Sequence, residues 1–325
     1  MSQHLSGLMV SGLAGIFAIW LSSFLPLVDS SILSLALGLS LSGLLRQEKH
    51  LSSGLGLASK LGLQYSIILL GFRLSFADIK SLGLWSFQLS IPLLFLAFAV
   101  ALVLGRQLKL SHNLTLLIAF GTAICGGSAI ASAAPILDAE EDDIVLALST
   151  VFLFNLLGLL IFPALGQALD LSQQTFGIWA GTAINDTSSV VAAGYSYGQV
   201  AGDVAVVVKL ARTLLILPAC VFFAFRRFEK GQSGRTRQLR QVFPTFVFLF
   251  LLASLLTSLG LIPDALRDLS QPLSKWLMAM ALFAVGSKLS IAQIKRAGLK
   301  PMLLGAMVWF SIGLASLLLQ QVMTP

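Results

Sequence analysis

The sequence predicts an all-α polytopic membrane protein with about 10–11 transmembrane helices, internal repeats and two broken or re-entrant helices. Of its 325 residues, 57% are hydrophobic and 11% are charged, and the mean hydropathy is +0.91. A soluble domain usually carries about 25% charged residues. Apolar runs long enough to cross a bilayer recur along the whole chain. Composition and pattern therefore exclude a soluble domain, with or without a single anchor.

The apolar segments follow one another with connections too short to form a soluble domain. Residues 1–325 are therefore expected to form a single integral membrane domain. The first segment lacks a basic start and has a long apolar stretch, so we expect a membrane helix there rather than a cleaved signal peptide. The segments are predicted at 8–26, 30–45, 60–73, 85–105, 114–136, 143–165, 174–197, 203–225, 243–262, 273–288 and 301–322.

Basic residues in the loops predict the orientation of the chain. They follow the second, fourth, eighth and tenth segments, for example Lys49, Arg106 and the run at 226–240. Because cytoplasmic loops are enriched in Lys and Arg, the N-terminus is expected in the cytoplasm. This placement accounts for the net charge of +7 without a nucleic-acid partner. Re-entrant hairpins at 114–136 and 174–197 would leave the assignment unchanged, so loop charge does not choose between spanning and re-entrant forms.

Two pairs of similar stretches indicate internal repeats. "GTAICGGSAIASAA" resembles "GTAINDTSSVVAAG", and the similarity extends over 121–143 and 181–203. A second pair, "GFRLSFADIK" at 71–80 and "GSKLSIAQIK" at 286–295, is identical at six of ten positions. Duplicated halves are common in transporters, whose substrate sites lie at the repeat interface near the bilayer midplane. The order of the stretches leaves open whether the halves are inverted or permuted.

Small and hydroxyl residues in the first pair predict two broken helices. Glycine, Asn and Asp weaken a helix, and polar groups are costly in hydrocarbon. Close packing of helices is the alternative explanation for the small residues. It suits the first copy better than the second, because packing needs no carboxylate and, of the two quoted stretches, only the second contains one. An unwound segment exposes N–H groups at the start of the next half-helix, where an anion is favoured. The candidate substrate-binding residues are Gly121, Thr122, Cys125, Gly126, Gly127, Ser128, Gly181, Thr182, Asn185, Asp186, Thr187, Ser188 and Ser189.

Two cations in the apolar span after the second copy extend this candidate site. Lys209 and Arg212 are three residues apart, hence on one helix face, and the first copy has no charge at these positions. Asp186 is the expected partner of one of them, and a purely structural ion pair is the alternative. Two cations and one carboxylate leave surplus positive charge, which an anionic substrate would compensate. Loss of the Lys209 proton through desolvation would instead make the trio a proton-coupling device.

The remaining polar residues give weaker evidence for a functional site. Asn155, in the middle of an apolar segment, is a weaker candidate for a hydrogen bond across helices, and Cys125 and Cys220 are expected to be packing residues. No histidine has metal-ligand spacing. The sequence has no G-x-x-x-x-G-K-[ST] motif for ATP and no Ser/His/Asp constellation at one depth. We therefore expect no enzymatic activity, no metal site and no cofactor, with H⁺ or Na⁺ as the candidate coupling ion.

The motifs "GTAICGGSAIASAAP", "GTAINDTSSVVAAG" and "VVKLARTLLILP", in this order and spacing, resemble the YeiH-type bacterial inner-membrane family described as sulfate exporters. The similarity runs from about residue 10 to 320. It implies a multi-pass secondary transporter of the bacterial inner membrane, related to transporters with inverted repeats and broken helices. The family's signature residues fall here on 121–128, 181–189, Lys209 and Arg212. Sulfite or an organic sulfonate fits the resemblance as well as sulfate.

Asn185 and Asp186 carry a second, shorter resemblance to the Asn-Asp pair of sodium/proton antiporters, whose carboxylate binds either ion. We therefore predict a secondary transporter of a small oxyanion, coupled to H⁺ or Na⁺ through Asp186. The alternatives are a cation/proton antiporter centred on Asp186 and a non-transporting sensor or assembly protein. The expected partners are the anion, the lipid bilayer and a second copy of the chain, since twofold pairs are the commonest oligomers. The sequence leaves the exact substrate, the direction of transport and the stoichiometry open.

Overall fold

The computed structural model describes residues 2–24, 30–45, 48–228, 245–288 and 298–323. Over these residues the secondary structure is helical without a strand, which confirms the predicted all-α class. Among the described helices, six are long and apolar enough to cross a membrane. The chain divides into two compact units, unit 1 from residues 1–81 and 244–290 and unit 2 from residues 82–243 and 291–325.

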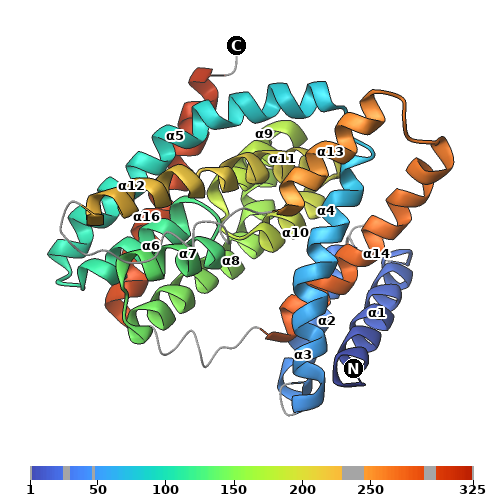
Figure 1. Cartoon of the computed structure of the whole chain (residues 1–325), viewed down its shortest axis with the longest axis horizontal. Helices are drawn as coiled ribbons and strands as arrows, with labels where there is room; N and C mark the ends of the chain where they lie inside the picture. The colour runs from blue at the N-terminus through green and yellow to red at the C-terminus, as the bar shows by residue number, and fades with distance from the viewer. Residues whose placement is uncertain (1, 25–29, 46–47, 229–244, 289–297, 324–325) are drawn as a thin grey trace. The chain divides into compact units, whose positions relative to one another are not determined.

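Unit 1 is a bundle centred on α14 (Asp264–Lys288). Its other helices are α1 (Ser2–Ser22), α2 (Ser30–Leu45), α3 (Lys49–Leu57), the π-helical turn η1 (Ala58–Gly62), α4 (Leu63–Gly71) and α13 (Thr245–Ser258). α14 packs against α1 and α2, and Figure 1 shows the three side by side. Gly38 lets α2 approach closely, because a Cβ there would lie 2.1 Å from the Phe283 carbonyl oxygen.

α14 is longer than the segment predicted at 273–288. It begins at Asp264, and its first two turns, which carry Arg267 and Asp268, are exposed. Pro272, just before the predicted start, therefore lies inside the helix rather than at its boundary. The stretch at 286–295, one half of the second repeat pair, lies mostly outside the described residues, so that repeat stays a prediction.

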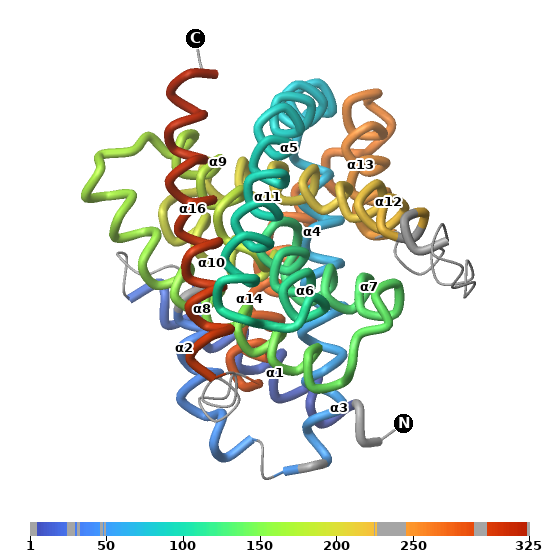
Figure 2. Tube along the Cα trace, turned by 90° about the vertical axis from the view of Figure 1, so that its left-hand side faces the viewer, coloured from blue at the N-terminus to red at the C-terminus, as the bar shows by residue number. Residues whose placement is uncertain are grey.

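Unit 2 contains the residues of the candidate site. Its helices are α5 (Phe76–Gln107, whose first residues belong to unit 1), α6 (His112–Ala123), α7 (Gly127–Leu137), α8 (Glu141–Ala168), α9 (Gln173–Ala183), α10 (Thr187–Tyr197), α11 (Gln199–Leu214), α12 (Ile216–Phe228) and α16 (Leu299–Met323). α5, α8 and α16 are each long enough to span a bilayer, and Figure 2 shows α16 as one uninterrupted helix. The two copies of the first repeat pair are instead interrupted at matching places, after α6 and after α9.

α6 and α7 form a re-entrant hairpin. The hydroxyl of Ser111, at the start of α6, donates a 2.7 Å hydrogen bond to Oδ2 of Asp143, in the first turn of α8. Near the tip, a Cβ on Gly121 would lie 2.8 Å from Cδ1 of Ile130, whereas a continuous helix would separate these residues by about 13 Å along its axis. The chain thus turns back at the break and returns to the level at which it entered. The segment predicted at 114–136 is therefore re-entrant rather than spanning.

α9 and α10 form a second re-entrant hairpin. The hydroxyl of Tyr197, the last residue of α10, donates a 2.5 Å hydrogen bond to the carbonyl oxygen of Leu171, just before α9. The Tyr197 ring also stacks on Phe176, with ring centroids 3.9 Å apart. The two ends of the segment predicted at 174–197 therefore lie together, and its middle forms the tip.

α8 joins the two hairpins and sets their directions. The first hairpin begins and ends beside the first turn of α8, where Asp143 lies. The second follows the other end of α8, where a Cβ on Gly166 would lie 2.5 Å from the Phe176 ring. The hairpins thus enter from opposite ends of a 28-residue helix, which is about 42 Å long. Their tips meet at Asn155, close to the midpoint of α8.

Candidate functional site

The first tip is the break at 124–126, between α6 and α7. Gly126 has φ +71° and ψ −130°, a conformation that strongly favours glycine. A Cβ at this position would lie 3.6 Å from both Nδ2 of Asn155 and Cα of Asp186, so this tip lies directly against the second one. α7 starts here without a side-chain cap. The first N–H groups of α7 thus keep their capacity to bind an anion.

The second tip is the break at 184–186, and here the following helix is capped. Oδ2 of Asp186 accepts hydrogen bonds from the backbone N–H groups of Ser188 and Ser189, at 3.0 and 3.3 Å, and from the Ser188 hydroxyl. The N–H of Asp186 in turn donates to Oδ1 of Asn155 at 3.1 Å. A carboxylate at the N-cap satisfies orphan donors and complements the positive helix end. The start of α10 therefore already carries an anionic group, whereas the start of α7 does not.

Lys209 binds the opposite ends of both breaks. It is fully buried in α11, and its Nζ donates hydrogen bonds to the carbonyl oxygens of Ile124 and Ile184, each at 2.9 Å. These carbonyls follow the last turns of α6 and α9, where a helix has partial negative charge and unsatisfied acceptors. One ammonium group therefore joins the C-terminal ends of two half-helices that come from opposite ends of α8.

Arg212 acts on the first hairpin alone. Its guanidinium donates from Nε to the carbonyl oxygen of Ala123 at 2.7 Å and from Nη2 to that of Thr122 at 2.8 Å. The expected ion pair with Asp186 is not formed: this carboxylate, Lys209 and Arg212 are all described, and no salt bridge joins them. Backbone carbonyls at helix ends compete successfully for the cations because their partial charges are already aligned and need no side-chain ordering.

The two sides of the tips differ in accessibility. At the start of α7, Ser128 is exposed and Gly127 is partly exposed. At the start of α10, Asp186, Thr187 and Ser189 are partly exposed. The side that holds the two cations is closed. The accessible surface of the tips is therefore the one lined by helix N-termini and hydroxyl groups, which is the chemistry that an oxyanion requires.

Two buried polar groups beside the breaks lack hydrogen-bond partners. Both amide atoms of Asn185 and Nη1 of Arg212 are unpaired, and both residues are 0% exposed. Nearly all buried polar groups in folded proteins are paired. Asn185 and Arg212 therefore retain binding capacity that the fold itself does not use.

Several predicted site residues also make structural contacts beside the breaks. A Cβ on Gly121 or Gly181 would lie 2.8 Å from a neighbouring side chain, so both glycines permit close contacts. The Thr182 hydroxyl shares a 2.5 Å hydrogen bond with Ser316 on α16. Thr122 takes part through its carbonyl oxygen, and Cys125 is buried with a free thiol. The structure thus brings together residues 125–128, residues 185–189 and the two cations, while the residues before each break hold the hairpins in place.

Two backbone carbonyls are the parts of the site that the sequence did not identify, and Asn155 is more central than its place as a weaker candidate suggested. Asn155 forms the predicted hydrogen bond across helices, to the second tip, and it also lies against the first tip. Asn155 lies halfway along a spanning helix, at the depth where the two copies break. This position is the signal that would have placed Asn155 at the site. The carbonyls of Ile124 and Ile184 have no sequence signal, because every residue carries one.

Comparisons with known proteins agree over the whole chain. A family model described as "Conserved hypothetical protein 698" matches residues 6–305. The chain is 34% identical to a UPF0324 membrane protein of Fusobacterium nucleatum, over 99% of both chains. It is 36% identical to a UPF0324 membrane protein of Streptococcus pneumoniae, over 98% of this chain and 97% of the relative. No solved structure matches the chain.

Proposed function

This chain belongs to the conserved hypothetical protein 698 family, whose relatives are UPF0324 membrane proteins, and we propose that it is a secondary transporter of a small oxyanion. The observation that carries the proposal is the pair of hydrogen bonds from Lys209 to Ile124 and Ile184. They neutralise the negative ends of α6 and α9 within one buried cluster. The positive ends of α7 and α10 lie on the accessible side, that of α7 without a side-chain cap and that of α10 capped by Asp186.

The position of this cluster also supports transport. Irregular backbone at membrane depth is tolerated only where it is buried in protein or lines a water-filled cavity. Transporters use half-helix N-termini near the bilayer midplane to hold anionic groups. Two hairpin tips that meet halfway along α8 supply such N-termini. If the basic loops face the cytoplasm, the first hairpin enters from that side and the second from the opposite one.

The residues have distinct roles in this proposal. The oxyanion, of the sulfate, sulfite or sulfonate type, accepts hydrogen bonds from the first N–H groups of α7 and from the Ser128 hydroxyl. Asp186 occupies the start of α10 as long as its carboxylate is ionised. Protonation weakens that cap and makes the N–H groups of Ser188 and Ser189 available to the substrate. Asp186 is thus the proposed coupling residue, with H⁺ as the coupling ion.

A cation/proton antiporter is the second candidate, because Asp186 is partly exposed, follows Asn185 in the chain and donates its backbone N–H to Asn155. In that case Asp186 binds H⁺ or Na⁺ and no anion moves. A non-transporting sensor or assembly protein is the third candidate, in which the cluster only fastens helices together.

Flux measurements in proteoliposomes separate the three functions. Counterflow of labelled sulfate and sulfite is measured for the wild type, for Ser128→Ala and for Ser196→Ala, a matched serine near the far end of α10. The proposal expects counterflow that falls about tenfold in Ser128→Ala, since a hydrogen bond to a charged group is worth about 1.5–3 kcal/mol, and that stays unchanged in Ser196→Ala. Sodium-driven proton movement without anion flux would identify the antiporter. No flux of anion or cation, with a folded protein, would favour the non-transporting alternative.

A further inference from the structure

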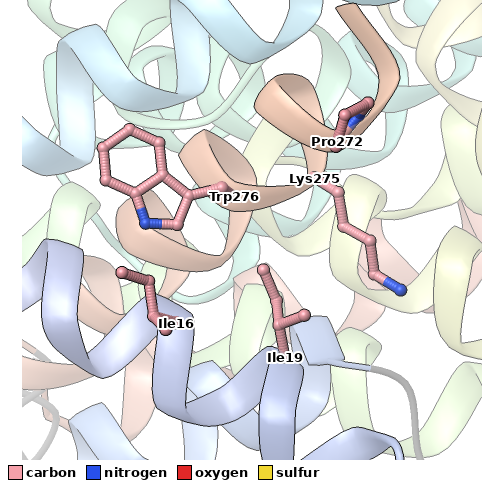
Figure 3. Close-up of a pocket in the computed structure, with 5 residues that line it drawn as sticks. All are labelled: Ile16, Ile19, Pro272, Lys275 and Trp276. Atoms are coloured by element: carbon pink, nitrogen blue, oxygen red, sulfur yellow. The ribbon is translucent and has the colours of Figure 1, made fainter. Parts of the chain in front are cut away.

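Unit 1 has an open groove between α1 and α14, well away in sequence from the two breaks. Its volume is about 360 Å³, and its lining residues are Ile16, Ile19, Pro272, Lys275 and Trp276. Figure 3 shows the two isoleucines on α1 facing the Trp276 ring and the Lys275 stem on α14. The indole N–H of Trp276 donates a 3.1 Å hydrogen bond to the carbonyl oxygen of Gly12, which holds the ring against α1. The groove is therefore a formed apolar surface with one ammonium group at its edge.

The ammonium group of Lys275 has no acidic neighbour on either helix of the groove. α1 carries no charged residue between Leu5 and Ser22. On α14 the residues one turn before and after Lys275 are uncharged, and the preceding carboxylate, Asp268, lies two turns away. Lys275 is exposed, and no salt bridge to it occurs within the described residues. A group that fills this groove would therefore be apolar along its length and anionic at one end.

Aromatic residues place the groove near the edge of the bilayer. α1 is long and apolar enough to cross a membrane. Trp20 follows directly after Ile19, and Phe24 lies just beyond the end of α1. Their side chains are 56% and 64% exposed, and their ring centroids are 4.8 Å apart. Exposed Trp at the end of a membrane helix is typical of the interface with water. The groove thus lies within about one turn of the headgroup level, where a lysine can extend its charge toward the headgroups.

We propose that this groove binds an anionic phospholipid. One acyl chain lies against the two isoleucines, Pro272 and the Trp276 ring, and the phosphate-bearing headgroup pairs with Lys275. The anionic class follows from an ammonium group that no described residue pairs, and the lipid source follows from the apolar walls on a membrane-facing helix. The site is independent of the proposed transport function, because none of its residues belongs to the two hairpins.

Lipid binding to the full-length, delipidated protein in detergent tests this site. Native mass spectrometry measures bound phosphatidylglycerol and phosphatidylcholine with identical acyl chains. We expect a preference for phosphatidylglycerol that falls about fivefold in Lys275→Gln, since one surface lysine is worth about 1 kcal/mol toward anionic lipid. Lys80→Gln, which removes another exposed lysine, is the matched control and is expected to keep the preference. Ile19→Trp fills the groove and is expected to reduce the binding of both lipids. This variant tests the site independently if Lys275→Gln does not fold.

Several results of these measurements would contradict the proposed lipid site. Equal binding of the two lipids by the wild type would overturn it, as would an unchanged preference in folded Lys275→Gln. A preference for phosphatidylglycerol that disappears in millimolar inorganic phosphate, with equal residual binding of both lipids, would show that Lys275 recognises free phosphate and would overturn the anionic-lipid assignment. Unchanged lipid binding in folded Ile19→Trp would place the lipid elsewhere.

Discussion

Oδ1 of Asn155 accepts a 3.1 Å hydrogen bond from the backbone N–H of Asp186, and this bond ties the tip of the second hairpin to the middle of α8. The same side chain lies against the first tip, at Gly126. The meeting of the two hairpins therefore depends on one neutral side chain as well as on Lys209. This arrangement makes the contributions of Asn155, Asn185, Lys209, Asp186 and Gly126 separable by mutation.

Replacing Asn155 with Leu is expected to destabilise the protein. The N–H of Asp186 would lose its acceptor while it stays partly buried, which typically costs about 1–3 kcal/mol. The free energy of unfolding in detergent, from denaturant titration followed by circular dichroism, measures this effect. A loss below about 0.5 kcal/mol would mean that water replaces Asn155 at no cost.

Replacing Asn185 with Leu is expected to have the opposite effect on stability. Both amide atoms of Asn185 are buried and unpaired, so an apolar side chain of similar size removes a desolvation cost instead of a bond. We expect unfolding stability to be unchanged or higher and anion counterflow to fall. Unchanged flux in a stable variant would show that Asn185 takes no part in transport.

Replacing Lys209 with Met is expected to be strongly destabilising. Two buried carbonyls would lose a shared charged donor, and hydrogen bonds to charged groups are worth about 1.5–3 kcal/mol each. Lys288→Met, which changes a lysine outside the cluster, serves as the control in the same thermal unfolding assay. Wild-type stability in Lys209→Met would mean that the two carbonyls find other donors and that the cation does not hold the tips together.

Replacing Asp186 with Asn is expected to separate coupling from binding. Asparagine is as good an N-cap as aspartate, so α10 should still form and the fold should be kept. The side chain no longer takes up a proton and keeps the N–H groups of Ser188 and Ser189 engaged, so we expect anion counterflow to continue at a lower rate through the start of α7 and to lose its stimulation by an inward proton gradient. Paired flux assays at equal and unequal pH check this. Complete loss of sodium/proton exchange, with no anion flux in the wild type, would support the antiporter instead.

Replacing Gly126 with Ala is expected to destabilise the first tip. The residue has φ +71°, and a side chain in such a conformation costs about 1–3 kcal/mol. Gly43→Ala is the matched control: Gly43 lies within α2 with open space around it, where alanine is favoured by about 0.5–1 kcal/mol. The two substitutions should therefore change the unfolding free energy in opposite directions, and the same sign for both would contradict the strain at the tip.

The sequence by itself determined that this is an all-α membrane protein and where its helices break. Hydropathy and the weak helix propensity of Gly, Asn and Asp are local properties, so both could be found without coordinates. The family was equally accessible, because its motifs are contiguous. Loop charge could not decide between spanning and re-entrant segments, since two re-entrant hairpins together leave the basic loops on the same side as two spanning segments do.

Only the tertiary structure decided that the two segments are hairpins from opposite ends of α8, and which groups the buried cations meet. The direction of a hairpin depends on contacts between its ends, such as that of Tyr197 with Leu171. Lys209 and Arg212 bind backbone carbonyls rather than Asp186. Carbonyls are present at every residue and become strong partners only where a helix ends without donors, so folding, not side-chain identity, selects them.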